Sequence, residues 1–327
     1  MRPLLKWAGG KRQLLPALRR YYPVNFDRYV EPFVGSGAVF FDLLAGGRLA
    51  SRRVHLADVN PDLIGCYRLV RDDADAVIAA LDALQREHRE RGEACYYEVR
   101  DRRFNPHRTA LGDRVAAAYT PSLAAMLIYL NRTGFNGLFR LNKQGAFNVP
   151  AGRYIEPRIC DPEHVRAVAA AFGAPGVSIE CAAFDATLSG ARAGDFVYCD
   201  PPYAPVSRTA NFAQYTADGF TSRHQQALQQ AVVAAARRGA VVLLSNSSAP
   251  EIEKAYSRPE ALHAGLTVRR VPARRAINSR ASHRGPVDEL IVTNAPAVRG
   301  QLRMAKGSLR PAYPDQLPTA RAGERKP

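Results

Sequence analysis

The stretch 195–203, DFVYCDPPY, limits what this chain can fold into more than any other. Its apolar first half is typical of a buried strand, but two consecutive prolines follow directly. Neither proline can donate a ladder hydrogen bond and each fixes its own φ, so a strand cannot continue through them. The chain must therefore leave a sheet at this point, with Asp200 and Tyr203 held on a stiff turn.

The turn that begins at Asp200 is suited to holding an amino group. A carboxylate and the carbonyl of Pro201 form a pair of acceptors, which matches the two donors of an amine. The exocyclic amine of a nucleobase is a poor nucleophile, and holding both its hydrogens favours a pyramidal nitrogen with a free lone pair. Pro202 adds stiffness, and Tyr203 would offer a π-face to a base removed from a duplex. The alternative is a surface turn whose aspartate caps a helix.

The charge of the chain favours a polyanionic partner. Among 327 residues, 46 are Lys or Arg and 30 are Asp or Glu, which gives a formal net charge of +16. Cationic side chains neutralise phosphates and release counterions, so this balance favours nucleic acid. The chain has no run of about 18 apolar residues and no secretory signal at its N-terminus, and we expect a cytoplasmic protein without a membrane partner. Its five scattered cysteines predict reduced thiols and no metal site.

Strand-like and helical patterns alternate through much of the chain. The apolar runs RYVEPF, RRVHLADVN, GVSIECAAF, DFVYCD and AVVLLSN are separated by helical patterns such as AVFFDLLAG and SRHQQALQQAVVAAARRG. This alternation predicts an α/β fold with a mostly parallel, doubly wound sheet. Near the end, LTVRRVPARR and DELIVTN predict a closing antiparallel pair.

The middle of the chain departs from this alternation. It is first helical and Arg-rich, and then becomes Gly- and Asn-rich over residues 131–154. We expect an inserted domain at 61–158, between the two parts of a catalytic domain at 1–60 and 159–295. Residues 296–327 are rich in Pro, Arg and Gly without periodicity, and we expect them to form a disordered basic tail.

A glycine turn, EPFVGSG, separates the first expected strand from the first helix. Open α/β sheets bind nucleotides at this position, and Gly35 and Gly37 would let the backbone approach a ligand closely. Asp58 ends the next strand 23 residues after Gly35, a spacing that suits a pair of ribose hydroxyls. The third glycine of the dinucleotide fingerprint is missing. The turn therefore favours a ligand with a ribose but no pyrophosphate, with an ordinary glycine turn as the alternative.

Five motifs in this order resemble the Dam-like DNA adenine-N6 methyltransferases, the D12 class or alpha group. They are LLKWAGGKRQLLP, YVEPFVGSG, ADVNPDLI, NRTGFNGLFRLNKQGAFNVPAGRY and CDPPYAPVSRTANF, and the resemblance runs over residues 3–294. It implies a Rossmann-like, mostly parallel methyltransferase sheet with one antiparallel strand, and an inserted, mainly helical DNA-recognition domain that carries a hairpin. It also implies a monomeric enzyme that transfers methyl from S-adenosylmethionine (SAM) to the N6 atom of a flipped adenine in double-stranded DNA.

The resemblance assigns residues to the cofactor and to the reaction. The positions that match cofactor contacts are Trp7, Lys11, Phe33, Gly35, Gly37, Asp58, Phe184 and Asp200. The positions that match the catalytic turn are Asp200, Pro201, Pro202 and Tyr203. The segment TANF, residues 209–212, is expected to close over the flipped adenine.

The same resemblance assigns a DNA-binding set. Its members are Lys6, Phe135, Asn136, Leu138, Arg140 and Pro150. Arg140 and Lys6 match residues that contact guanines, and a guanidinium suits the two acceptors of that base. Phe135 and Asn136 match residues that enter the base stack, and Leu138 and Pro150 match contacts to a thymine methyl. Together they imply the target GATC.

Two alternatives remain from the residues themselves. A cytosine-N4 methyltransferase would use the same amine chemistry, although its turn usually begins with serine, and a DNA-binding relative could have lost catalysis. A cytosine-C5 enzyme would need a cysteine nucleophile, whereas Cys199 lies on an expected buried strand and is interpreted as an inert thiol. The pair Ser247-Ser248 departs from the His-Asp common in the family, which leaves the role of that loop open.

Overall fold

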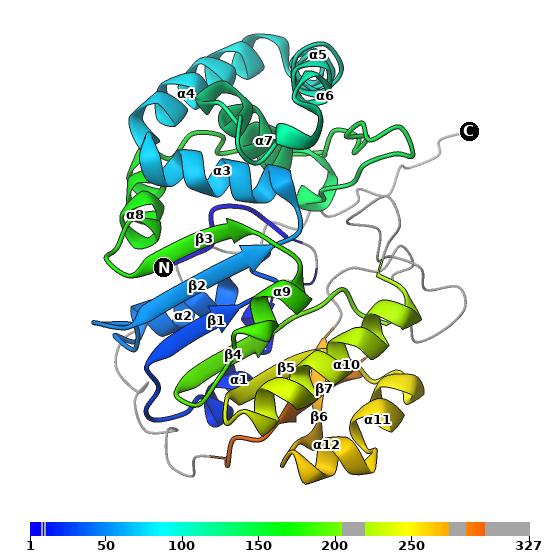
Figure 1. Ribbon diagram of the computed structural model, residues 1–327. Helices are drawn as coiled ribbons and strands as arrows, with labels where there is room; N and C mark the ends of the chain where they lie inside the picture. The colour runs from blue at the N-terminus through cyan, green and yellow to red at the C-terminus, as the bar shows by residue number, and fades with distance from the viewer. Residues whose placement is uncertain (8, 10, 205–219, 275–285, 298–327) are drawn as a thin grey trace, which may run out of the picture.

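The computed structural model describes residues 1–7, 9, 11–204, 220–274 and 286–297. These residues form one seven-stranded sheet with the strand order β3-β2-β1-β4-β5-β7-β6 (Figure 1). The strands are β1 (Arg28–Glu31), β2 (Arg53–Asp58), β3 (Val177–Cys181), β4 (Asp195–Cys199), β5 (Val241–Ser247), β6 (Thr267–Arg274) and β7 (Pro286–Thr293). Among them β7 alone runs in the opposite direction to the other strands, so its pairs with β5 and β6 are antiparallel. This arrangement confirms the expected Rossmann-like α/β sheet.

The central strands of the sheet are buried on both faces, and successive side chains point to opposite faces. In β4, Phe196 and Tyr198 join the hydrophobic cluster that contains helix α2 (Ala38–Ala45). Val197 and Cys199 join the second cluster, which contains helix α10 (Ser222–Arg237). Helices therefore cover both faces of the sheet, as Figure 1 shows. Cys199 is fully buried and its burial raises the pKa of the thiol, which confirms the interpretation of an inert cysteine.

The remaining helices that flank the sheet are short, with the exception of α8. They are α1 (Leu15–Leu18), α8 (Pro162–Phe172), α9 (Phe184–Ser189), α11 (Pro250–Tyr256) and α12 (Pro259–His263), with 3-10 turns η1 (Lys11–Gln13) and η2 (Arg19–Tyr21). Among the described helices, none combines the length and the apolar character that crossing a membrane requires.

The insertion is mainly helical and gathers above β3 in Figure 1. Its helices are α3 (Pro61–Asp72), α4 (Ala74–Arg91), α5 (Glu93–Glu98), the π-helix η3 (Val99–Phe104), α6 (Asn105–Ala110) and α7 (Pro121–Thr133), with 3-10 turns η4 (Gly112–Arg114) and η5 (Phe135–Gly137). A hairpin follows α7, with isolated antiparallel bridges in place of full strands. Helix α3 contacts β3 and α8 as well as α7, so it joins the insertion to the sheet. The domain boundaries remain a prediction.

Three predicted features lie outside the described residues. They are the segment TANF at 209–212, most of the basic loop before the last strand, at 275–285, and the tail from residue 298 onward.

Candidate active site and DNA-reading surface

The candidate active site lies where the parallel strands end. Strands β1, β2, β4 and β5 run in one direction, so their carboxyl ends meet along one edge of the sheet. The glycine turn follows β1, Asp58 ends β2, and Asp200 follows β4. Ligands of open α/β sheets bind at this edge, and the fold therefore gathers the predicted cofactor and catalytic residues in one region.

Asp200 is held by two polar side chains. The Lys11 ammonium lies 2.9 Å from Asp200 Oδ1, and Ser245 donates a hydrogen bond of 2.9 Å to the same oxygen. Lys11 also donates to the Gly9 carbonyl at 2.5 Å, so the N-terminal segment fixes its position. Burial raises the pKa of Asp200 above its ordinary value, against the lowering effects of Lys11 and Ser245. The side chain is 21% exposed, and the carboxylate remains open to a ligand.

Tyr203 is fixed at its hydroxyl and on one face of its ring. The hydroxyl donates to Glu289 Oε2 in β7 at 2.8 Å. The Lys11 ammonium lies 4.3 Å from the ring centroid, a cation–π distance. Because Lys11 covers that face, a base stacked on Tyr203 must lie on the opposite one.

The end of the catalytic turn is tied to β5 and α10. Gln225 donates to the Pro202 carbonyl at 2.9 Å, and Asn246 donates to Gln225 at 3.1 Å. Ala204 donates its N–H to Asn246 at 3.4 Å, while its carbonyl accepts a bond of 2.7 Å from Ser247. Ser247, at the position where the sequence departs from the family, therefore holds the turn in this chain.

The glycine turn has the backbone conformation that its sequence predicts. Gly35 and Gly37 have φ values of +45° and +69°, in the region that favours glycine. A Cβ on Gly35 would lie 3.0 Å from Trp7 Cδ1, so the turn also brings Trp7 to the site. Asp58 Oδ2 accepts from the Gly35 N–H and Oδ1 from the Asn60 N–H, both at 3.0 Å. Burial raises the pKa of Asp58 to about 6.

Aromatic side chains line the site beside the glycine turn. Phe33 and Phe184, both predicted to contact the cofactor, stack with ring centroids 5.5 Å apart. Phe220, just before α10, lies 5.9 Å from each of them. These three rings could enclose a flat apolar ring such as an adenine.

The N-terminal segment meets the hairpin at Lys6. The backbone N–H and carbonyl of Lys6 both bond to the Asn131 side chain at 2.8 Å. Asn131 also donates to the Gly137 carbonyl, and a Cβ on Gly137 would lie only 2.5 Å from Lys6 Cβ. Tyr154 completes the junction, with the Lys6 ammonium 4.5 Å from its ring centroid. The fold thus unites predicted DNA contacts that are far apart in sequence.

The other members of the predicted DNA-binding set lie along the hairpin. Phe135 is 49% exposed, an unusual exposure for a large apolar ring, and Asn136 beside it is exposed with φ +55°. Arg140 is exposed and donates to the Asn148 side chain at 2.8 Å. Leu138 is half-buried, and Pro150 is exposed with its carbonyl bonded to the Phe135 N–H.

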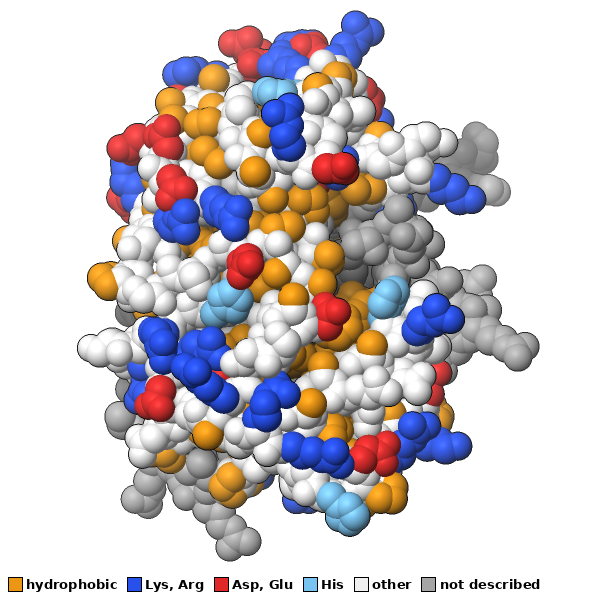
Figure 2. Space-filling view, viewed as in Figure 1, with side chains coloured by type: hydrophobic (Ala, Val, Ile, Leu, Met, Phe, Trp, Pro, Cys, Tyr) orange, Lys and Arg blue, Asp and Glu red, His pale blue; other side chains and the backbone are white. Residues whose placement is uncertain are grey.

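The charge of the chain is spread over its surface. On the face shown in Figure 2, Lys and Arg side chains cover parts of both the helical insertion and the sheet, interspersed with Asp and Glu. The net charge of +16 therefore acts through many side chains.

A family model described as D12 class N6 adenine-specific DNA methyltransferase matches residues 7–271. The chain belongs to this family. Its activity is therefore adenine-specific, site-specific methylation of DNA, as the resemblance of its five motifs implied.

Curated relatives of this D12-class methyltransferase cover nearly its whole length. The Type II methyltransferase M1.LlaDCHI of Lactococcus lactis subsp. cremoris is 35% identical, over 90% of this chain and 95% of its own length. M.MjaIII of Methanocaldococcus jannaschii is 36% identical over 90% and 99%. The DNA adenine methylase of Escherichia coli K12 is 35% identical over 91% and 96%. The resemblance drawn from the motifs is confirmed.

Several contacts of this methyltransferase had no signal in its sequence. Ser245, Gln225 and Glu289 bond to the catalytic turn but occupy ordinary positions of β5, α10 and β7. Phe220 precedes the Thr221 cap of α10 and looks like a loop residue. Only the folded chain shows that these side chains converge.

Proposed function

We propose that this methyltransferase takes its methyl group from SAM, acts as a monomer on double-stranded DNA, and methylates adenine in GATC. DNA is found in the cytoplasm, and we propose that the enzyme works there. The observation that carries the proposal is the position of Asp200, whose Oδ1 forms an ion pair with Lys11 and accepts a hydrogen bond from Ser245. Both contacts use Oδ1, and we assign Oδ2 to the adenine amine.

The residues at the strand ends fit SAM. A side chain at Gly35 would close the space beside Trp7, and Asp58 presents a half-buried carboxylate for the ribose hydroxyls. Phe33 and Phe184 offer stacked rings for the cofactor adenine. When bound, SAM supplies an electrophilic methyl group from its sulfonium. The absence of a third glycine agrees with a ligand that has no pyrophosphate.

The residues of the turn would hold and orient the target base. Asp200 Oδ2 and the Pro201 carbonyl accept the two hydrogens of the adenine N6, and this frees the nitrogen lone pair. The Pro202 carbonyl is already bonded to Gln225, so it does not compete for this role. Tyr203 stacks on the base with the face opposite Lys11. The Lys11 ammonium favours the ionised form of Asp200, against the burial that raises its pKa. No covalent bond to the enzyme and no metal is needed.

The hairpin supports recognition of GATC. Arg140 and Lys6 would contact guanines, and Leu138 and Pro150 a thymine methyl, through the geometry by which major-groove contacts discriminate bases. Phe135 and Asn136 are exposed where η5 begins the hairpin and would fill the space left by the flipped adenine. These are proposals for single residues, and each can be changed alone.

The test is to incubate the protein with SAM and unmethylated plasmid and to map the modified bases by sequencing that distinguishes N6-methyladenine. N6-methyladenine confined to GATC is the expected result. N6-methyladenine at another sequence would refute the target but keep the mechanism. N4-methylcytosine, or no modification with SAM, would refute the mechanism.

A further inference from the structure

The hairpin formed by residues 134–152 lacks a continuous ladder, although single backbone hydrogen bonds cross it from Phe135 to Pro150, from Asn148 to Arg140 and from Asn142 to Ala146. Between its described limbs, isolated bridges pair Gly134 with Ala151 and Leu141 with Phe147, and no longer ladder forms. Isolated two-stranded hairpins are marginally stable in water. The side chains that we assign to DNA therefore need support from elsewhere to keep one geometry.

The returning limb of the hairpin receives this support from a single helical segment, residues 96–108. Three carbonyls at alternate positions accept side-chain hydrogen bonds here, two in the extended limb and one at Gly145 in the bend of the tip, where φ is +77°. In an extended chain the carbonyls of alternate residues point to the same side. The bonds run from Arg108 to Gly145 (2.7 Å), from Asn105 to Phe147 (3.0 Å), and from Arg100 and Tyr96 to Val149 (3.0 and 2.9 Å). Asn105 Oδ1 also accepts a hydrogen bond of 2.8 Å from the Phe147 N–H. The side-chain amide of Asn105 therefore bonds to both backbone groups of Phe147, as a residue of a neighbouring strand would.

The π-helix η3 is what brings these four donors to one side. Tyr96 and Arg100 are four residues apart and Asn105 and Arg108 are three apart, spacings that share a helix face. Arg100 and Asn105, however, are five apart, which in an α-helix would set them roughly 140° apart around the axis. The π-helix η3, which spans Val99–Phe104, lies between the two pairs. Its wider turns bring residues five apart closer to one face, so both pairs can point to the hairpin.

Arg108 is anchored in the body of the protein. Its Nε lies 2.9 and 2.7 Å from the two oxygens of Asp62, whose side chain is fully buried. Its Nη1 is the atom that holds the Gly145 carbonyl. Asp62 belongs to the first turn of α3, capped by Asn60, which also binds the carboxylate of Asp58. Arg108 therefore links the hairpin tip to the helix that begins beside the cofactor acid.

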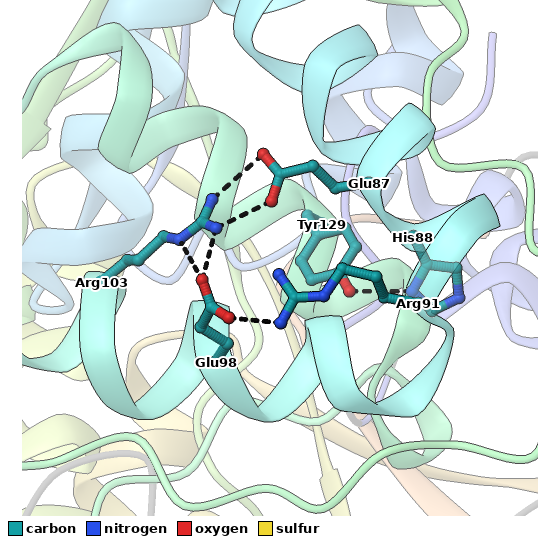
Figure 3. Close-up of polar contacts among 6 residues, drawn as sticks. All are labelled: Glu87, His88, Arg91, Glu98, Arg103 and Tyr129. Atoms are coloured by element: carbon teal, nitrogen blue, oxygen red, sulfur yellow. Dashed lines mark hydrogen bonds and ion pairs between the residues drawn. The ribbon is translucent and has the colours of Figure 1, made fainter.

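On its opposite side, the segment 96–108 is bonded to α4 through polar side chains. Figure 3 shows Arg103 bonded to Glu87 at 3.1 and 2.8 Å and to Glu98 at 3.2 and 2.6 Å. Arg91 meets the other oxygen of Glu98, and His88 bonds to Tyr129 in the same view. These contacts steady the segment, but none of them reaches the hairpin.

Asn148 links the position of the returning limb to the orientation of the Arg140 side chain. It lies between Phe147 and Val149, the two residues that the helical segment holds. Its N–H bonds to the Arg140 carbonyl at 3.1 Å, and its side-chain oxygen accepts from Arg140 Nε at 2.8 Å. A shift of the limb would therefore turn the guanidinium that we assign to a guanine.

We propose that Asn105 and Arg108 are positioning residues for sequence recognition. They hold the returning limb so that Asn148 orients Arg140 toward the DNA. This inference rests on the proposed DNA-reading role of the hairpin. It adds that discrimination between bases depends on residues that touch no base.

The test compares three variants of the full chain with the wild type. Asn105→Asp keeps the acceptor for the Phe147 N–H but replaces the donor to its carbonyl. Arg108→Lys keeps a cation beside Asp62 but cannot also reach Gly145 as a planar fork does. Arg103→Lys loosens the same segment on its other side and is the matched control. Each is assayed for kcat/KM on a duplex with the mapped site and on duplexes with one base pair changed, together with SAM affinity and Tm.

Asn105→Asp and Arg108→Lys should each lower the ratio of kcat/KM between the mapped site and the changed sites by about tenfold, the effect of one lost hydrogen bond. Their SAM affinity should stay within about twofold of the wild type. Arg103→Lys should lower Tm and leave the ratio unchanged. If Arg108→Lys or Asn105→Asp fails to fold, Asn105→Ala removes both bonds to Phe147 without a new charge and must show the same loss.

An unchanged ratio in the folded Asn105 variants would overturn the inference. So would an equal loss in Arg103→Lys, because the effect would then be one of stability alone. A wild type that methylates without regard to sequence would refute the proposed function, and this inference with it. A wild type that discriminates while its variants discriminate equally refutes the positioning role only.

Discussion

The catalytic turn at 200–204 and the recognition hairpin at 134–152 are both irregular, but the protein holds them in different ways. The turn begins where a central strand ends, and side chains from β5, β7, α10 and the N-terminal segment meet it there. The hairpin follows α7 in the insertion, and side chains of the helical segment 96–108 bind the backbone of its returning limb. The chemistry is therefore tied to the strand ladder, whereas recognition depends on a separate support. Changes in the two regions should alter different kinetic constants.

The largest effect is expected at Asp200. Asp200→Asn keeps the shape of the side chain but removes the charge and one acceptor, so we expect kcat to fall on the order of 10³-fold, the scale of a lost transition-state contact. Single-turnover methylation measures the loss. DNA affinity, measured by fluorescence anisotropy, should persist because the hairpin is untouched. Near-normal turnover in this variant would show that the mechanism is wrong.

The recognition hairpin should give the opposite pattern. Arg140→Ala is expected to relax discrimination at one guanine by about 1–3 kcal/mol in kcat/KM, because a two-point contact to that base is lost. Competition between duplexes that differ at one position measures this change. The matched control is Lys143→Ala at the hairpin tip, an exposed cation that should affect all duplexes alike. Equal losses on every duplex for Arg140→Ala would show that it contacts phosphate instead.

Asp58, the acid assigned to the cofactor ribose, lies outside both regions and provides a test by pH. Burial raises the pKa of Asp58 to about 6, so its carboxylate gains a proton near that pH rather than near 4. Ribose hydroxyls donate to the ionised form, and SAM affinity should therefore reach its full value about one pH unit above that pKa. It should fall about tenfold by one unit below that pKa. Calorimetric titration with SAM at several pH values measures it.

The control for the pH test is Asp58→Asn, which cannot titrate. This variant should bind SAM weakly and with little dependence on pH between 5 and 7. A wild-type affinity that does not change across this range would show that Asp58 does not hold the ribose in its ionised form.

The smallest effect is expected at the bond between Tyr203 and Glu289. Tyr203→Phe keeps the ring but removes the hydroxyl, and we expect kcat to fall about fivefold, as for one hydrogen bond of about 1 kcal/mol. A change of size at Glu289 would disturb β7. Glu289→Gln is therefore the matched variant, because it keeps the size of the side chain and an acceptor oxygen. The double variant should lose little more than Tyr203→Phe alone, since both act on one contact. Additive losses would show two independent roles.

Much of the fold could be predicted from the sequence. The alternation of apolar runs and helical patterns predicted the sheet, and LTVRRVPARR and DELIVTN predicted its antiparallel end, because these patterns report burial that is local in the chain. The prolines after Cys199 and the glycines at 35 and 37 predicted turns, because each restricts or requires particular backbone angles. The insertion was recognised by its loss of alternation.

The partners of the site could not be predicted in this way. Ser245 and Glu289 look like ordinary strand residues, and Lys11 lies 189 positions before the Asp200 that it meets. Asn105 and Arg108 stand in a charged helical stretch in which no spacing points to Phe147 and Gly145, which lie 42 and 37 residues later. Their roles depend on which side chains converge, and that is set by packing between distant segments.

The sequence by itself therefore determined the kind of sheet, the turn that follows β4, and the family. Each of these follows from a short run of residues whose backbone limits or periodicity act locally. Only the tertiary structure decided that Lys11 covers one face of Tyr203, that Ser247 fastens the turn, and that a π-helix supports the hairpin. These contacts join residues far apart in the chain, and the free energy that selects them comes from the packing of the whole core.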